Sequence, residues 1–290
     1  MRASAVDVLT RGLDIRDEAV PGEHGPVPVR RYDRADGPTV AALVWVHGGA
    51  FSHGGLDQLE SHAVAAALAQ RGVGVVAVDY RRVPAWNWFR DAPPGPLPGV
   101  RYPLPLDDVA SVYETVRRAR PDAWLGGASA GACLSAAAAL RLAARDATVP
   151  AGLVLAYGTF HAALPPIPEH VRARVRGRHG LAQIRAATVR RMNHNYAGSA
   201  EAMGEPFAFP GGHDLRGLPD TLVVDADRDT LRASGEAFAR ELAAAGVPVD
   251  HHVVAESRHG FLDRPEAPYF TEGIALIADR LTAPRKDDSP

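Results

Sequence analysis

The chain has 290 residues, with 32 Lys and Arg against 34 Asp and Glu, and a formal net charge of −2. This length accommodates one large α/β domain or two ordinary ones, and the near-neutral charge gives no electrostatic reason to expect nucleic acid or an anionic membrane as a partner. The single cysteine, Cys133, excludes an internal disulfide and suits a reducing cytoplasm. The first residues lack the apolar stretch of a signal peptide, and no apolar run approaches the roughly 20 residues that span a bilayer. We therefore expect a cytoplasmic protein.

The first 40 residues predict a short helix within residues 1–13 and then an antiparallel hairpin, because polar and apolar side chains alternate on both sides of Pro21-Gly22-Glu23-His24-Gly25. From there on, apolar runs of strand length alternate with runs of helix length. Buried strands are predicted over residues 40–46, 73–78, 123–125, 152–157, 221–226 and 249–254. Helices are predicted over residues 56–70, 107–118, 132–144, 181–196, 233–245 and 268–281. Repeated strand–helix units favour a mainly parallel sheet with helices on both faces, whose ligands lie at the carboxyl ends of the strands.

Two stretches interrupt this alternation, and the last residues, 283–290, are expected to be frayed. Residues 84–105 are rich in Pro, Gly and aromatic side chains, and we expect an ordered loop near the mouth of the site. Residues 158–212 are dense in Arg and His and are expected to form a helical insertion between strands. The arginines there could clamp an acidic substrate or form a solvated lid, and the lid is favoured because charge runs usually face water.

The stretch Gly127-Ala128-Ser129-Ala130-Gly131 has the G-x-S-x-G spacing of a nucleophile elbow, in which a strand turns abruptly into a helix. Both glycines are needed because the turn brings their positions so close that a Cβ would collide with its neighbour. The Ser129 hydroxyl is then expected above the sheet edge, on a strained backbone. The pattern alone is a modest signal, because Gly, Ala and Ser are abundant in this chain.

A serine nucleophile needs a base, and a carboxylate must orient that base. In this architecture the order along the chain is serine, acid, histidine. His259 follows the last predicted strand and is the expected base, whereas the pair at 251–252 falls inside that strand and is expected to be structural. Asp225 is expected within the preceding strand, while Asp227 and Asp229 both lie on its exit loop. Spacing alone does not separate Asp227 from Asp229.

The same chemistry needs donors for a developing oxyanion. The N–H of Ala130 opens a helix, whose dipole favours negative charge. A second set is expected from Gly48, Gly49 and Ala50, which directly follow a buried strand and carry little side-chain bulk. The remaining histidines show no metal-ligand spacing, so we expect neither a metal nor a cofactor.

These motifs resemble the hormone-sensitive lipase family of α/β-hydrolases over roughly residues 38–283. The run H-G-G-A-F at 47–51 resembles the family's oxyanion loop, D-Y-R at 79–81 and L-D-D at 106–108 resemble two further family segments, and H-G-F ends the pattern at 259–261. The resemblance implies an α/β-hydrolase fold, with a mostly parallel central sheet flanked by helices and a small helical cap insertion.

The family's acid motif, D-P-L-R-D-E-G, aligns with residues 229–235, which places the catalytic aspartate on Asp229 and leaves Asp227 as the alternative. The resemblance therefore implies a carboxylic-ester hydrolase that acts through Ser129, His259 and Asp229 and an acyl-enzyme, with an ester and water as its partners. Short to medium acyl chains are preferred, because the sequence shows no long apolar tunnel. A lactone or amide hydrolase would use the same residues, and the rival of another class is a non-catalytic ligand-binding protein on this fold.

We expect a single domain over residues 1–290, with cap elements at about 1–13 and 158–212. Three rings, Phe51, Tyr157 and Phe261, are expected to bind substrate. The chain departs from the family in having Ala128 where an aspartate is usual, Pro84-Ala85 in place of a glutamate-containing segment, and a short amino-terminal lid region. With that short lid the pocket is either more open or closed by a partner chain, which keeps a homodimer among the expectations.

Overall fold

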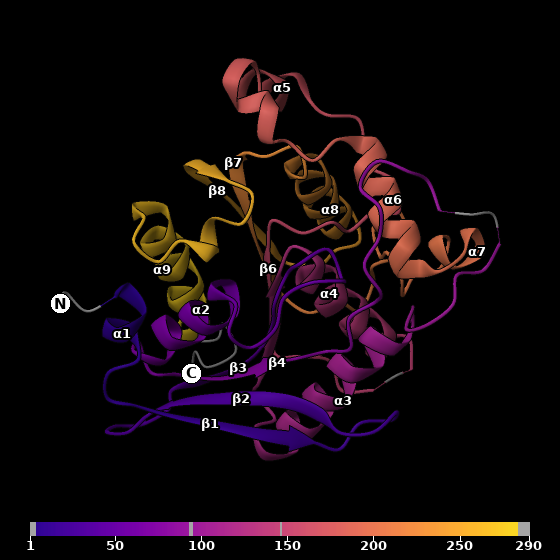
Figure 1. Ribbon diagram of the computed structural model, residues 1–290. Helices are drawn as coiled ribbons and strands as arrows, with labels where there is room; N and C mark the ends of the chain where they lie inside the picture. The colour runs from indigo at the N-terminus through magenta and orange to yellow at the C-terminus, as the bar shows by residue number, and fades with distance from the viewer. Residues whose placement is uncertain (1–3, 93–94, 146, 284–290) are drawn as a thin grey trace.

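The computed structural model describes residues 4–92, 95–145 and 147–283, so the expected frayed tail at 284–290 lies outside the described residues. Its strands form one eight-stranded sheet in the order β1-β2-β4-β3-β5-β6-β7-β8 (Figure 1). The β1–β2 and β2–β4 pairs are antiparallel and all other pairs are parallel, which confirms the predicted sheet. The strands are β1 Leu13–Val20, β2 Val27–Arg34, β3 Ala41–Val46, β4 Val73–Val78, β5 Trp124–Ala128, β6 Leu153–Ala156, β7 Thr221–Arg228 and β8 Val249–Arg258.

Helices cover both faces of this sheet (Figure 1). One apolar cluster joins the sheet to α3, α4 and α8, and a second cluster joins its other face to α2 and α9. The single cysteine, Cys133, lies buried in the first cluster. The helices are α1 Ala5–Leu9, α2 Leu59–Ala69, α3 Leu104–Ala119, α4 Ala130–Ala143, α5 Glu169–Arg174, α6 Ala186–Ala197, α7 Ala200–Met203, α8 Arg232–Ala244 and α9 Pro268–Thr282, with 3-10 segments η1 Gly177–Ala182 and η2 Phe261–Asp263.

The central strand β3 shows why the core divides in two. All six of its residues are buried, as the continuous apolar run predicts for a strand covered on both sides. Its side chains alternate between faces, so Val44 and Val46 pack with α3 and α4 while Leu43 and Trp45 pack with α2 and α9. The last residue of β3, Val46, pairs with Gly127, two residues before Ser129.

Several boundaries differ from the sequence expectation. Helix α3 begins at Leu104 instead of Asp107, because Pro103 and Pro105 occupy its cap and first turn, where proline is tolerated. Strand β8 runs on to Arg258 through a register shift near Glu256, whose φ is 60°. The helix predicted over 181–196 is split into η1 and α6.

The insertion between β6 and β7 carries α5, η1, α6 and α7, which lie outside the two helical layers of the sheet (Figure 1). Two of its arginines pair with carboxylates outside the insertion: Arg174 with Asp227 and Glu256, and Arg191 with Asp91. At the other end of the chain, α1 packs against α2. None of the helices within the described ranges is long and apolar enough to cross a membrane.

Candidate active site

Ser129 stands at the junction of β5 and α4 and has φ 53° and ψ −115°. A Cβ on Gly127 would lie 2.5 Å from the Val46 carbonyl oxygen and 2.6 Å from the carbonyl carbon of Gly131, so the turn tolerates only glycine there. The positive φ of Ser129 costs about 1–3 kcal/mol for a non-glycine residue, and the packing around the turn must offset this cost. The preceding Ala128, where the family resemblance suggests an aspartate, is fully buried and pairs with Ala156 of β6.

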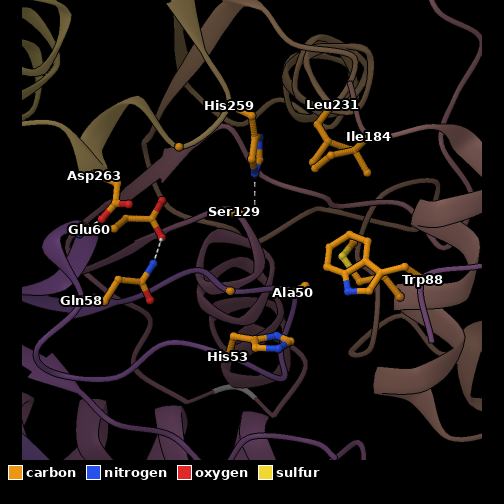
Figure 2. Close-up of a pocket in the computed structure, with 13 residues that line it drawn as sticks. Ala50, His53, Gln58, Glu60, Trp88, Ser129, Ile184, Leu231, His259 and Asp263 are labelled. Atoms are coloured by element: carbon orange, nitrogen blue, oxygen red, sulfur yellow. Dashed lines mark hydrogen bonds between the residues drawn. The ribbon is translucent and has the colours of Figure 1, made fainter. Parts of the chain in front are cut away.

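The structure brings Ser129, His259 and Asp229 together at the carboxyl edge of the sheet. Ser129 Oγ lies 3.0 Å from His259 Nε2 (Figure 2). On the other side of the ring, His259 Nδ1 lies 2.7 Å from Asp229 Oδ2. Asp229 is 1% exposed, and its other oxygen accepts the Leu231 N–H at 2.9 Å. Because an ionised carboxylate only accepts hydrogen bonds, the proton of neutral His259 sits on Nδ1 and leaves Nε2 free to accept from the serine hydroxyl.

Electrostatics favour His259 as a base that can hold a proton. Burial lowers the pKa of His259, but the charge of Asp229 and its hydrogen bond outweigh burial, so the pKa is raised above the usual 6.5. The charges of Glu60 and Asp225 act in the same direction. The imidazolium form of His259 is thereby stabilised beside Ser129.

The competing aspartates have other partners. Asp227 lies within β7, so its predicted place on the exit loop is wrong. It accepts hydrogen bonds from Nε and Nη2 of Arg174 and lies near Arg232, so it faces the insertion and not His259. Asp225 lies within β7, is fully buried, and contacts His251 Nε2 at 2.9 Å. Burial raises the pKa of Asp225 to about 6. The geometry therefore favours Asp229 as the carboxylate that orients His259.

The loop after β3 lies against the serine. Gly49 and Ala50 line the same cavity as Ser129, and within the described part of the chain their N–H groups have no hydrogen-bond acceptor. Ala130 is the first residue of α4, so its N–H has no partner within the helix. Gly48 differs from the prediction, because its N–H donates to the buried Glu60 carboxylate at 2.7 Å and is not available to an oxyanion. The candidate donors are therefore Gly49, Ala50 and Ala130.

A cavity of about 290 Å³ opens in front of these groups. In Figure 2 Ser129 and His259 stand between a polar side, formed by Gln58, Glu60 and Asp263, and an apolar side that contains Trp88, Ile184 and Leu231. Trp88 comes from the Pro- and Trp-rich loop, as predicted for a loop near the site mouth. The remaining lining residues are Gly49, Ala50, His53, Met192 and Gly260. Ile184, Met192 and Leu231 were not foreseen, since single apolar residues in the insertion and on an exit loop carry no periodic signal.

The three rings expected to bind substrate do not line this cavity. Phe51 is fully buried and stacks on Tyr196 with centroids 4.0 Å apart. Tyr157 and Phe261 are also buried and pack edge to face against each other at 5.1 Å. Large apolar rings beside a site gain more free energy behind its wall than on its surface. They support the cavity without forming its surface.

Neither the arginines of the insertion nor a metal cluster adds to this site. Arg172, Arg174 and Arg176 pair with protein carboxylates, and none of them lines the catalytic cavity, so the placement of these described side chains favours a solvated lid over a clamp. Glu23, His24 and Asp107 could offer three metal ligands elsewhere, but Asp107 already pairs with Arg141 at 2.5 Å. That positive charge disfavours a cation there.

Comparison with known proteins identifies the family of the chain. The family described as alpha/beta hydrolase fold matches residues 96–263. The match spans more than half of the chain, and the chain therefore belongs to this family, among its hormone-sensitive-lipase-like esterases. By class it is a carboxylesterase, which sets aside the rival idea of a non-catalytic binding protein.

Individual relatives extend the likeness over most of the chain. This chain is 29% identical over 269 residues to Esterase LipI of Mycobacterium tuberculosis, and the match covers 86% of this chain and 75% of that protein. It is 30% identical over 249 residues to Carboxylesterase NlhH of the same species, covering 82% and 72%. An esterase structure from Pyrobaculum calidifontis superposes with a TM-score of 0.79 at 26% identity, covering 96% of this chain and 88% of that one.

Proposed function

We propose that this chain hydrolyses esters of short to medium acyl chains through an acyl-enzyme, with Ser129 as nucleophile, His259 as general base and acid, and Asp229 as the orienting carboxylate. The observation that carries the proposal is the continuous hydrogen-bonded line from Ser129 Oγ to His259 and on to Asp229, with contacts of 3.0 and 2.7 Å. A serine hydroxyl is a weak nucleophile, and such a line is what activates it.

In the first half of the reaction, Ser129 Oγ attacks the ester carbonyl while His259 Nε2 takes the hydroxyl proton. The carbonyl oxygen becomes an oxyanion, which the N–H groups of Gly49, Ala50 and Ala130 hold. When the intermediate collapses, the bond to the alcohol oxygen breaks and His259 returns its proton to that oxygen. The alcohol leaves and the acyl group stays on Ser129.

In the second half, water replaces the alcohol. His259 takes a proton from the water as its oxygen attacks the acyl carbonyl, and the same N–H groups hold the second oxyanion. Collapse breaks the bond to Ser129 Oγ, which regains the proton from His259, and the carboxylic acid leaves. No cofactor enters this sequence.

The acyl preference rests on the size of the cavity. A volume of about 290 Å³ bounded by Trp88, Ile184, Met192 and Leu231 accommodates a short or medium chain, and the apolar side matches an acyl group. Residues 158–212 supply Ile184 and Met192 and are proposed as the cap of a single domain. A lactone or amide substrate would meet the same groups.

A panel of aryl esters from acetyl to palmitoyl tests the proposal. We expect the highest kcat/KM for acetyl to hexanoyl esters, a steep loss for palmitoyl, and loss of turnover in Ser129→Ala at unchanged folding by circular dichroism. Hydrolysis that survives Ser129→Ala would refute the triad, and a maximum at palmitoyl would refute the acyl preference.

A further inference from the structure

Glu60 is a buried carboxylate that the proposed reaction does not use. It lies in the first turn of α2, is 3% exposed, and forms part of the cavity wall beside Ser129 (Figure 2). No Lys, Arg or His of the described chain lies within ion-pair distance of it. A carboxylate taken out of water without a cationic partner is costly unless strong hydrogen bonds compensate. The hydrogen bonds to its two oxygens therefore matter for its place in the fold.

One oxygen of Glu60 holds the oxyanion loop. Oε2 accepts the Gly48 N–H at 2.7 Å, and it would collide with any Cβ on Gly48. The three residues that follow all have positive φ: 114° at Gly49, 53° at Ala50 and 61° at Phe51. Such backbone persists only when its surroundings over-determine it. With the Gly48 N–H fixed on Glu60, the next two N–H groups are left for the cavity.

The other Glu60 oxygen, Oε1, is linked to His259 through Tyr157. Oε1 accepts the Tyr157 hydroxyl at 2.7 Å, and Tyr157 is fully buried with φ 36°. The Tyr157 ring meets the His259 ring edge to face, with centroids 5.2 Å apart. The backbone N–H of Glu60 also donates to Asp263 Oδ1 at 3.1 Å, four residues beyond His259. One residue thus contacts the segments that carry the oxyanion donors and the base.

We propose that Glu60 is a positioning residue that fixes the oxyanion loop and the His259 ring relative to Ser129 and adds negative charge beside the base. The inference rests on the proposed triad and deepens it. Substrate does not need to touch the Glu60 carboxylate, because both its oxygens are engaged by the protein.

Two variants separate geometry from charge. Glu60→Gln keeps the volume but loses the charge and one acceptor, and we expect kcat to fall ten- to hundredfold with KM changed less than threefold, since oxyanion donors act mainly in the transition state. Glu60→Asp keeps the charge but not the reach, and kcat should fall by a similar factor. Asp57→Asn is the matched control, because Asp57 lies on the same segment with a 92% exposed side chain and pairs with Arg30. It should leave kcat unchanged.

The pH dependence supplies a readout that a merely structural role would not move. The charged groups acting on His259 are Asp229 and Asp225 from β7 and its exit loop and Glu60 from α2, and Asp263 lines the same cavity. Removing the Glu60 charge lowers the pKa of His259, so the acid limb of kcat/KM should move to lower pH in Glu60→Gln and stay in place in Glu60→Asp and Tyr157→Phe. Histidine titration by NMR in Ser129→Ala, with and without Glu60→Gln, measures the same shift without turnover.

Two results would overturn the inference: kcat within twofold of wild type in Glu60→Gln, or an unshifted His259 titration in the Ser129→Ala background. If Glu60→Gln does not fold, Glu60→Asp and Tyr157→Phe decide it, because wild-type kcat in both would overturn it equally. Activity that survives Ser129→Ala would instead remove the triad proposal, so the two failures are distinguishable.

Discussion

The catalytic edge of the sheet and the insertion above it are held in different ways. Ser129 and Asp229 are fixed by strand ends whose backbones are hydrogen-bonded on both sides and whose side chains are buried. The insertion is held by side chains: Val189 and Met192 of α6 join the apolar cluster of the sheet, and Arg174 of α5 pairs with Asp227. Ile184 and Met192 of the insertion line the cavity. We infer that the backbone of the core sets the geometry of the proposed reaction, whereas side chains of the insertion set the fit of the substrate.

The sharpest way to separate the two regions is to change two neighbouring aspartates, Asp227 near the end of β7 and Asp229 directly after it. Asp229→Asn should lower kcat about 10³- to 10⁴-fold, because an amide no longer holds the required tautomer of His259 or stabilises its charge. Asp227→Asn should lower kcat less than tenfold, since Asp227 serves Arg174 and Arg232. Steady-state kinetics on one short aryl ester measures both. The reverse order would assign the acid to Asp227.

Two Gly→Ala substitutions, one in the elbow and one in the insertion, test the same contrast through the free energy of unfolding. Gly127→Ala places a methyl group 2.5 Å from the Val46 carbonyl oxygen, and we expect a loss of about 3 kcal/mol in the free energy of unfolding. Gly204→Ala in the insertion meets its nearest atom, the Glu201 carbonyl oxygen, at 3.3 Å and should cost under about 1 kcal/mol. Urea denaturation measures the difference. Equal losses would mean that the insertion is packed as tightly as the elbow.

The pH dependence of kcat/KM tests the catalytic edge of the sheet without involving the insertion. The pKa of His259 is raised above 6.5, mainly by Asp229 acting against burial, and only neutral His259 accepts the Ser129 proton. As pH falls below that pKa, kcat/KM should fall about tenfold per pH unit. The same raised pKa stabilises the folded state at low pH, and this contribution is lost as pH rises through it. A plateau of kcat/KM extending well below pH 6.5 would contradict the assignment.

The strand ends could be predicted from the sequence because parallel strands carry a simple signal. Buried apolar runs mark the strands, and the residues that follow them, Ser129, Asp229 and His259, converge at one edge by topology alone. Identifying the acid needed more than spacing, because the sequence did not show that β7 continues through Asp227 and ends just before Asp229. Family resemblance favoured Asp229, and its contact with His259 agrees with that choice.

What the sequence did not reveal depends on which side chains become buried. Gly48 follows the same strand as Gly49 and looks equivalent to it, but a carboxylate twelve residues later takes its N–H. That carboxylate, Glu60, reads as an ordinary acid in the first turn of a helix. Trp88 and Ile184 come from stretches without periodicity, so the apolar side of the cavity, which they line, could not be assigned from the sequence pattern. Tertiary burial decided each of these cases.

The smallest expected effect comes from loosening the insertion. Arg174 of α5 pairs with Asp227 and Glu256, and its side chain is 41% exposed, so Arg174→Gln should leave the free energy of unfolding almost unchanged. We expect KM to rise about two- to threefold at low salt with kcat unchanged, because the cavity wall shifts while the triad does not. The difference from wild type should vanish near 1 M NaCl, where such pairs are screened.

Arg172→Gln is the matched control for this effect. Arg172 lies on the same short helix but pairs with Glu169 within it, so the change removes a charge without releasing the helix from the sheet. Its KM should equal that of wild type at every salt concentration. If Arg172→Gln raises KM as much as Arg174→Gln does, the effect comes from the net charge of the insertion and not from its attachment to β7. The Arg174–Asp227 pair would then have no part in holding the cavity wall.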